Sequence, residues 1–216
     1  MKKITKKIIM ILLIIVVVMF LLVAHLNHEY FFVNDFYETN KTIGVIDGGL
    51  SFDNENIVIT NIDYTFCGEQ KKHGDYLLDF IEKVSDVSIA YFDACDEFGK
   101  INTERIITGL EWMKENDIKY VNISLSGNRY SEELENWLED NPDIHVYASY
   151  NNNKNSFDYP AMYDGVIGSS VDEELVKSEK DRVYSSNKIV LDYDFKNIYE
   201  GNSFLSVLSL MSDLED

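Results

Sequence analysis

Apolar positions along the chain alternate between short β-branched runs and longer stripes with helical spacing. The short runs predict strands at residues 42–46, 87–92, 120–125, 145–149 and 166–168. The stripes predict helices around residues 76–84, 106–113 and 134–138. Because strands alternate with helices along the chain, we expect an α/β domain with a mainly parallel central sheet.

The N-terminal 26 residues differ from this pattern. An uninterrupted apolar run at 8–24, extended by Leu26, directly follows a lysine-rich stretch at 2–7. The run exceeds the usual apolar core of a signal peptide and reaches the roughly 17–25 residues that cross a bilayer. Its end, 22–24, is a poor cleavage site because Leu22 occupies a position that requires a small residue. We therefore expect residues 1–26 to be an uncleaved transmembrane signal anchor, with a cleaved signal peptide as the alternative.

The lysines also predict the orientation of this anchor and, with the remaining charge, the kind of partner. Positive residues stay in the cytoplasm, so the rest of the chain is expected outside the cell membrane, after a spacer at 27–41. The net charge is −19 although the tip is basic, so the extracytoplasmic part is strongly acidic. Such a surface repels phosphate backbones, and no nucleic-acid partner is expected.

The cysteine content adds little chemistry. Cys67 and Cys95 fit either one extracellular disulfide or two unpaired thiols. No histidine stands near them at ligand spacing, so they cannot form a metal site. We expect no metal and no cofactor.

Polar residues gather where the predicted strands end. Asp47 follows the first core strand, and a run of asparagines at 151–153 follows a later one. Catalytic groups collect at this edge of a parallel sheet, although turns use the same residue types. His73 opens a predicted helix, and Ser203 precedes an apolar segment. The chain order Asp47, His73, Ser203 is one of the orders known for a Ser-His-Asp triad.

The residues around these positions resemble the subtilisin-like serine peptidases over about 42–211. The segment T-I-G-V-I-D-G-G-L at 42–50 is similar to the family's V-A-V-I-D-T-G-I, and H-G at 73–74 to the start of its H-G-T-H. The most specific match is 106–125, which is similar to the family helix and strand I-x-x-G-I-x-W-A … V-I-N-M-S-L-G. Three further segments are similar to A-A-A-G-N, Y-P-A and G-T-S-M-A-S, namely 147–151, 159–161 and 201–206.

This resemblance implies a three-layer subtilisin-like fold in 42–216 and a serine endopeptidase that hydrolyses a peptide or protein substrate. Asp47, His73 and Ser203 would form the triad. Asn151 would donate to the oxyanion, although the neighbouring asparagines leave 151 or 152 open. An extended peptide would add as a strand to an edge formed by Ser124, Leu125, Ser126 and Gly127.

Departures from the family pattern leave alternatives. Asp75 stands where the family has Thr and would place a second carboxylate near the imidazole. Tyr150 and Asn202 replace Gly and Thr. Little chain precedes the first core strand and little follows Ser203, so three alternatives are open: a domain that folds slowly, one that is inactive, or one that depends on a folding or activating partner. The alternative functions are a catalytically inactive subtilase-like module that binds peptides or a partner, and an unrelated α/β binding domain.

Overall fold

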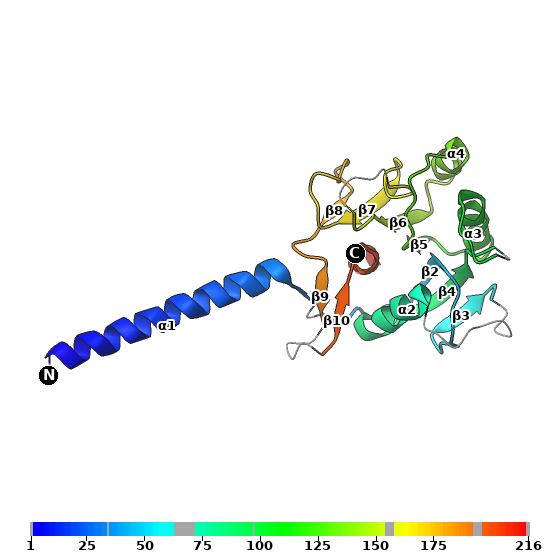
Figure 1. The fold of residues 1–216 in the computed structure, drawn as a ribbon. Helices are drawn as coiled ribbons and strands as arrows, with labels where there is room; N and C mark the ends of the chain where they lie inside the picture. Colours follow the sequence, from blue (N-terminus) through cyan, green and yellow to red (C-terminus); the bar gives the residue numbers. More distant parts are fainter. Residues whose placement is uncertain are drawn as a thin grey trace.

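A seven-stranded, all-parallel sheet forms the centre of the protein, as the computed structural model shows for residues 2–33, 35–62, 72–96, 98–153, 158–191 and 196–214 (Figure 1). Its strands are β2 (Thr42–Asp47), β3 (Ile57–Thr60), β4 (Ser88–Asp93), β5 (Tyr120–Ile123), β6 (His145–Ser149), β7 (Val166–Ser170) and β8 (Arg182–Val183). They are ordered β3-β4-β2-β5-β6-β7-β8. The predicted fold class, α/β with a parallel sheet, is confirmed.

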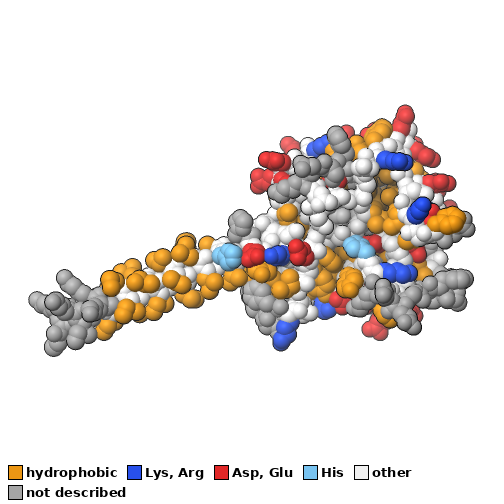
Figure 2. All heavy atoms as spheres, viewed as in Figure 1, with side chains coloured by type: hydrophobic (Ala, Val, Ile, Leu, Met, Phe, Trp, Pro, Cys, Tyr) orange, Lys and Arg blue, Asp and Glu red, His pale blue; other side chains and the backbone are white. Residues whose placement is uncertain are grey.

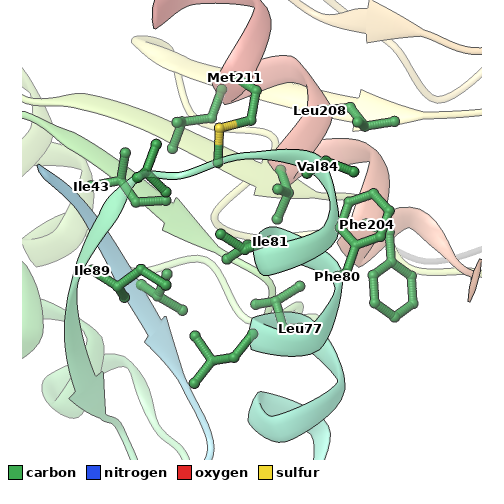
Figure 3. Close-up of a cluster of buried hydrophobic side chains, with 14 of the residues drawn as sticks. Ile43, Leu77, Phe80, Ile81, Val84, Ile89, Phe204, Leu208 and Met211 are labelled. Atoms are coloured by element: carbon green, nitrogen blue, oxygen red, sulfur yellow. The ribbon is translucent and has the colours of Figure 1, made fainter. Parts of the chain in front are cut away.

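Helices cover both faces of this sheet. On one face, α2 (His73–Val84) and α5 (Asn202–Leu214) share a core cluster with β2 and β4. Figure 3 shows Phe80 of α2 beside Phe204 of α5, and their ring centroids are 5.2 Å apart. On the other face, α3 (Thr103–Glu115) and α4 (Glu132–Asp140) bury a second cluster. The protein therefore has three layers, as predicted.

Helix α5 is the most deeply buried helix in this arrangement. Leu205, Val207 and Leu210 are fully buried, and so are Ser206 and Ser209. Burying one large apolar side chain contributes roughly 1.5–3 kcal/mol relative to leaving it exposed. The packing of α5 against β5, β6 and β7 thus holds the residues at its N-terminus, Asn202 and Ser203, in a fixed position.

A second, three-stranded sheet lies beside the first. It consists of β1 (Phe31–Phe32), β9 (Lys188–Val190) and β10 (Ile198–Glu200), in the order β1-β9-β10. β1 pairs with β9 in parallel, and β10 pairs with β9 antiparallel. These strands, like β3 and β8, contain two to four residues, too few for an apolar alternation to be recognised in the sequence.

Helix α1 (Lys2–Glu29) projects away from the domain (Figure 1). Its stretch Ile8–Leu26 contains 19 residues, and none of it is buried by the rest of the protein. Apolar side chains cover the helix along this stretch (Figure 2). By length and composition the stretch is sufficient for a membrane span or a signal sequence.

The segment expected as a spacer, 27–41, contacts the domain. It contains the end of α1 and all of β1, and Val33 is buried in the core cluster of α2 and α5. Tyr37 forms an isolated bridge with Ser85. The division of the chain at residues 26 and 41 stays a prediction. The two alternatives for Cys67 and Cys95, one disulfide or two unpaired thiols, both stay open, because Cys67 lies outside the described residues.

Candidate active site

Asp47 and His73 form a hydrogen-bonded pair at the carboxyl edge of the sheet. Asp47 is the last residue of β2, which lies between β4 and β5, and its side chain is buried. His73 begins α2, and Nδ1 of its imidazole lies 2.8 and 3.0 Å from the two carboxylate oxygens of Asp47. Because a carboxylate only accepts hydrogen bonds, Nδ1 carries the proton and Nε2 is left with the lone pair.

The surroundings shift the pKa of both Asp47 and His73. The hydrogen bond to Asp47 raises the pKa of His73 above its ordinary value of 6.5, and partial burial opposes this rise. Burial raises the pKa of the Asp47 carboxyl, and the hydrogen bond and charge of His73 oppose that rise. The side chain of His73 remains 46% exposed, so a solvent-side reactant can approach it.

A close contact at Gly74 places the start of α2 against the sheet. A Cβ at this position would stand 2.0 Å from the hydroxyl oxygen of Tyr91, so only glycine allows the helix to approach this far. The Tyr91 hydroxyl is buried and donates a hydrogen bond to the carbonyl oxygen of Gly48, next to Asp47. Tyr91 therefore supports both the β2 end and the α2 start.

Asp75 is used in capping α2. Its carboxylate accepts hydrogen bonds from the backbone N–H of Lys72 at 2.6 Å and of Ser51 at 2.9 Å. The first bond is one half of a capping box, in which an acidic residue satisfies a free N–H at the helix start. Among the described residues, no hydrogen bond joins Asp75 to His73, so Asp75 does not compete with Asp47 for the imidazole.

Ser203 lies in the first turn of α5, where unpaired N–H groups and the helix dipole favour negative charge. The preceding Gly201 has a φ of 125°, a conformation that favours glycine. The hydroxyl of Ser203 donates to the carbonyl oxygen of Ser124 at 3.4 Å.

A buried polar network connects this helix start to β5. Asn122 is fully buried; its Nδ2 donates to the Ser124 hydroxyl at 2.6 Å, and its Oδ1 accepts from the Ser206 hydroxyl at 2.7 Å. Ser206 lies 2.8 Å from the carbonyl oxygen of Ser203, and Ser124 donates to the same oxygen at 3.3 Å. The Asn122 side chain thus bonds the two hydroxyl groups, of Ser124 and Ser206, that contact the backbone of Ser203.

His73 and Ser203 line the same cavity, which has a volume of about 370 Å³. Its remaining walls come from the side chains of Tyr76, Phe204 and Asn152 and from β10. In the part of the chain that the structure describes, no hydrogen bond joins His73 to Ser203. The structure nonetheless brings the three predicted triad residues to one place, two of them bonded and the third across a shared cavity.

Asn152, and not Asn151, lines this cavity. Oδ1 of Asn151 accepts the backbone N–H of Asn153 at 2.9 Å, which turns this side chain into the local loop. Oδ1 of Asn152 accepts the backbone N–H of Asn202 at 2.9 Å, which leaves its Nδ2 as the donor for a ligand. The sequence left both asparagines open, because the path of the loop after β6 decides which of them turns inward.

Tyr150, where the family pattern has glycine, is accommodated below this loop. Its ring is buried against Gly168 of β7, where a Cβ would lie 2.5 Å from the ring. Its hydroxyl donates to Asp181 at 3.1 Å. Its carbonyl oxygen accepts from Nδ2 of Asn202 at 3.1 Å, so the two unexpected residues contact each other.

The residues predicted to bind substrate fall into two groups. Leu125, Ser126 and Gly127 line a cavity of about 440 Å³ together with Tyr159 and Pro160 of the segment similar to Y-P-A. Ser124 is buried, and its contacts hold Ser203. The backbone N–H and C=O of Gly127 are bonded to Tyr159, with both distances at 2.9 Å.

A further cavity is remote from these residues. It has a volume of about 770 Å³ and lies beside His145 and Arg182, where β6 and β8 begin, at the opposite edge of the sheet. Among the described residues, no group of three or more His, Cys, Asp or Glu side chains could hold a metal ion.

Comparisons with known proteins agree with the fold. No family model matches the chain, and no curated protein matches it. Among solved structures, the chain is similar to the psychrophilic subtilisin-like protease Apa1 from the Antarctic psychrotroph Pseudoalteromonas sp. AS-11, with a TM-score of 0.51 and 18% sequence identity. The match covers 70% of this chain and 41% of that chain. The fold is subtilisin-like.

In this subtilisin-like sheet, the strand order places the candidate site at a topological switch point. From β2 the chain moves to β3 and β4 on one side, and β5 to β8 then follow on the other side. Ligand sites of open α/β sheets form at the carboxyl ends of strands where the order reverses in this way. Asp47 ends β2 and Ser124 follows β5, so they flank the crevice.

Proposed function

We propose that the protein is a membrane-tethered extracytoplasmic serine endopeptidase that uses Asp47, His73 and Ser203. The observation that carries the proposal is the buried Asp47 carboxylate bonded to Nδ1 of His73, with the imidazole and Ser203 lining one cavity. The subtilisin-like fold supports the proposal by placing these residues at the switch point of the sheet.

Each residue has a definite part in the proposed reaction. Nε2 of His73 removes the proton from the Ser203 hydroxyl as its oxygen attacks the carbonyl carbon of the scissile bond. The imidazolium, stabilised by Asp47, then protonates the leaving amine. In the second half, His73 deprotonates a water whose oxygen attacks the acyl carbon. The ester bond to Ser203 then breaks, and the imidazolium returns the proton to the serine oxygen. This chemistry uses no cofactor.

The oxyanion formed by the attack requires hydrogen-bond donors. We assign this part to Nδ2 of Asn152 and the backbone N–H of Ser203, in place of Asn151. Asn202 supports the assignment because its backbone N–H holds Oδ1 of Asn152 and so turns Nδ2 outward. The N-terminal end of α5 adds a favourable dipole for the same charge.

The hydrogen bond from Ser203 to Ser124 is compatible with this reaction. At 3.4 Å it is long, and the proposed reaction requires the serine side chain to exchange it for a bond to His73. Hydrogen bonds between catalytic groups are often long in ligand-free enzymes and shorten when substrate binds. The same observation favours a second candidate function, an inactive subtilase-like module in which Ser203 is a structural residue that binds Ser124.

The proposed substrate is an extended peptide or protein segment that lies along Leu125, Ser126 and Gly127, with side chains reaching the 440 Å³ cavity. The proposed tether is α1, whose apolar stretch would cross the membrane with the lysines on the cytoplasmic side. An activating or folding partner, one of the alternatives open from the sequence, remains part of the proposal.

A fluorophosphonate probe tests the proposal, because it reacts only with activated serines. The full-length protein in detergent micelles is expected to be labelled, and Ser203→Ala and His73→Ala are expected to lose the label. Ser185→Ala, at an exposed serine, is the matched control and should be labelled like the wild type. Folded wild-type protein without Ser203-dependent labelling would favour the inactive module.

A further inference from the structure

The end of helix α1 is held firmly against the domain. Ser186 donates its hydroxyl hydrogen bond to the carbonyl oxygen of Glu29, and the Glu29 carboxylate forms an ion pair with Lys188 at 2.8 Å. The Lys188 ammonium also lies 5.5 Å from the centroid of the Tyr30 ring. Figure 2 shows charged side chains of both signs gathered where the apolar helix meets the domain. The helix is therefore joined to the domain without a flexible linker.

The chain continues from this contact directly into a sheet. Phe31 and Phe32 of β1 pair with Ile189 and Val190 of β9. The N–H of Val33 donates to the carbonyl oxygen of Val190 at 3.0 Å, and Val33 itself is buried. Only residues 27–30 separate the apolar stretch of α1 from β1, and 27–29 are still helical.

The same sheet leads to the candidate active site. On the other side of β9 lies β10, where Ile198, Tyr199 and Glu200 line the cavity shared by His73 and Ser203. Tyr199 packs against Phe80 and Phe204, with ring centroids 4.9 and 5.2 Å apart, so β10 is fixed to α2 and α5. A three-stranded sheet thus connects the proposed membrane anchor to the reactive serine.

These dimensions limit the distance between the site and the point where α1 would leave the bilayer. Neighbouring strands are about 4.8 Å apart, so β10 lies roughly 10 Å from β1. The helical residues after Leu26 add about 1.5 Å each. The cavity is therefore held on the order of 15 Å from the point where α1 would leave the membrane. An extended chain spans that distance in roughly five residues.

We propose that the substrates are themselves membrane-held polypeptides, cut in an extended segment within about ten residues of the bilayer surface. This inference rests on the proposed peptidase function. A rigid connection of this length keeps the site close to the lipid, where the bilayer hinders a folded soluble protein and a juxtamembrane segment is always present. Substrate choice is thereby set by position along the membrane normal as well as by sequence.

The test uses the full-length protein reconstituted in phosphatidylcholine and phosphatidylglycerol vesicles. The probe substrate is a single transmembrane helix followed by a disordered 60-residue segment of mixed sequence; a second probe carries the same segment in reversed order. Cut positions are mapped by mass spectrometry. In both probes the wild type is expected to cut only within the first ten or so residues, at the bonds in that stretch that the site accepts.

Two insertion variants test whether the distance between the membrane and the active site determines the cut positions. A 20-residue Gly/Ser insertion between Tyr30 and Phe31 lengthens the connection, and its cuts should spread along the whole segment. The same insertion between Lys7 and Ile8, on the opposite side of the apolar stretch, should leave the wild-type distribution unchanged. Equal fluorophosphonate labelling of Ser203 in both variants verifies that they are folded.

The outcomes are distinguishable. Cuts that follow sequence and reverse their position in the reversed probe would overturn the inference, and so would a distribution that the Tyr30–Phe31 insertion leaves unchanged. Either result would leave the peptidase function standing. If Ser203→Ala vesicles give the same products as the wild type, the proposed function itself fails, and the inference fails with it.

Discussion

Gly74 and Tyr91 occupy adjoining positions with no space for one additional carbon, since a Cβ on Gly74 would lie 2.0 Å from the tyrosine hydroxyl. Tyr91 is fully buried on β4, and its hydroxyl is bonded to the carbonyl of Gly48. The contact therefore couples the residue after Asp47 to the residue after His73. The hydrogen-bonded pair of Asp47 and His73 therefore lies beside a glycine position that tolerates no larger residue.

This contact predicts the effect of Gly74→Ala. Overpacking of this kind costs about 1–3 kcal/mol, and we expect the free energy of unfolding to fall by that amount. Tyr91→Phe in the same protein removes the closest atom and should recover part of the loss. Chemical denaturation of the wild type, both single variants and the double variant measures the coupling. Strictly additive changes would contradict the proposed contact.

The raised pKa of His73 predicts the pH dependence of the serine. Only neutral imidazole can accept the Ser203 proton, and the hydrogen bond to Asp47 stabilises the protonated form. The rate of fluorophosphonate labelling should therefore rise with pH and reach half its maximum above 6.5, the ordinary value for histidine. A midpoint below 6.5 would show that Asp47 does not stabilise the imidazolium.

Removal of the carboxylate gives a sharper version of this test. Asp47→Asn keeps the shape of the side chain but loses its charge and can present a donor to Nδ1, which favours the wrong tautomer. In a serine protease triad this change lowers kcat by about 10⁴, and we expect a loss of similar order in the labelling rate. Asp75→Asn is the matched control. Its carboxylate bonds backbone N–H groups, so stability should fall with little effect on labelling rate per folded molecule.

The asparagine loop supplies a paired prediction. Asn152→Ala removes the proposed oxyanion donor and should lower kcat by about 10²–10³, a magnitude that comes from subtilisin itself. Asn151→Ala removes only the contact to the Asn153 backbone and should change kcat less than tenfold. Hydrolysis of a generic peptide ester by the two variants compares them directly. A larger loss for Asn151→Ala would return the oxyanion assignment to that residue.

The buried network at Asn122 should be needed for both stability and reactivity. Asn122→Ala removes one hydrogen bond from each of the buried hydroxyls of Ser124 and Ser206, which then keep only the carbonyl oxygen of Ser203 as a partner among the described residues. Each lost hydrogen bond costs about 0.5–1.5 kcal/mol. We expect a lower free energy of unfolding and slower labelling of Ser203, because the start of α5 is then less well held. Normal labelling in the folded variant would limit Asn122 to a structural role.

The sequence predicted the parts of the fold in which many residues repeat one pattern. The stripe of α2 and the buried run of β2 are long enough to be recognised, and the triad order followed from residues next to such elements. β8 and β1 contain two residues each and depend on partners distant in the chain, Ser169 and Ile189 among them. No local pattern indicates such pairings.

The site was predictable in kind but not in every residue. Asp75 looked like a second charge beside the imidazole, yet its carboxylate is turned to two backbone N–H groups. Asn152 and Asn151 are chemically identical, and only the conformation of the loop assigns one to the cavity. Differences of this kind depend on side-chain direction, which residue type and spacing do not determine.

In the proposed peptidase, the bridge between Gly127 and Tyr159 has a consequence for substrate selection. A peptide that pairs with Gly127 must replace two existing hydrogen bonds, so it exchanges backbone partners instead of gaining them. The main chain of the substrate, which every peptide has in common, then contributes little net binding free energy at this position. The choice between substrates then depends on the substrate side chain that fills the cavity beside Leu125 and Tyr163. This favours a selective peptidase over one that digests proteins at many sites.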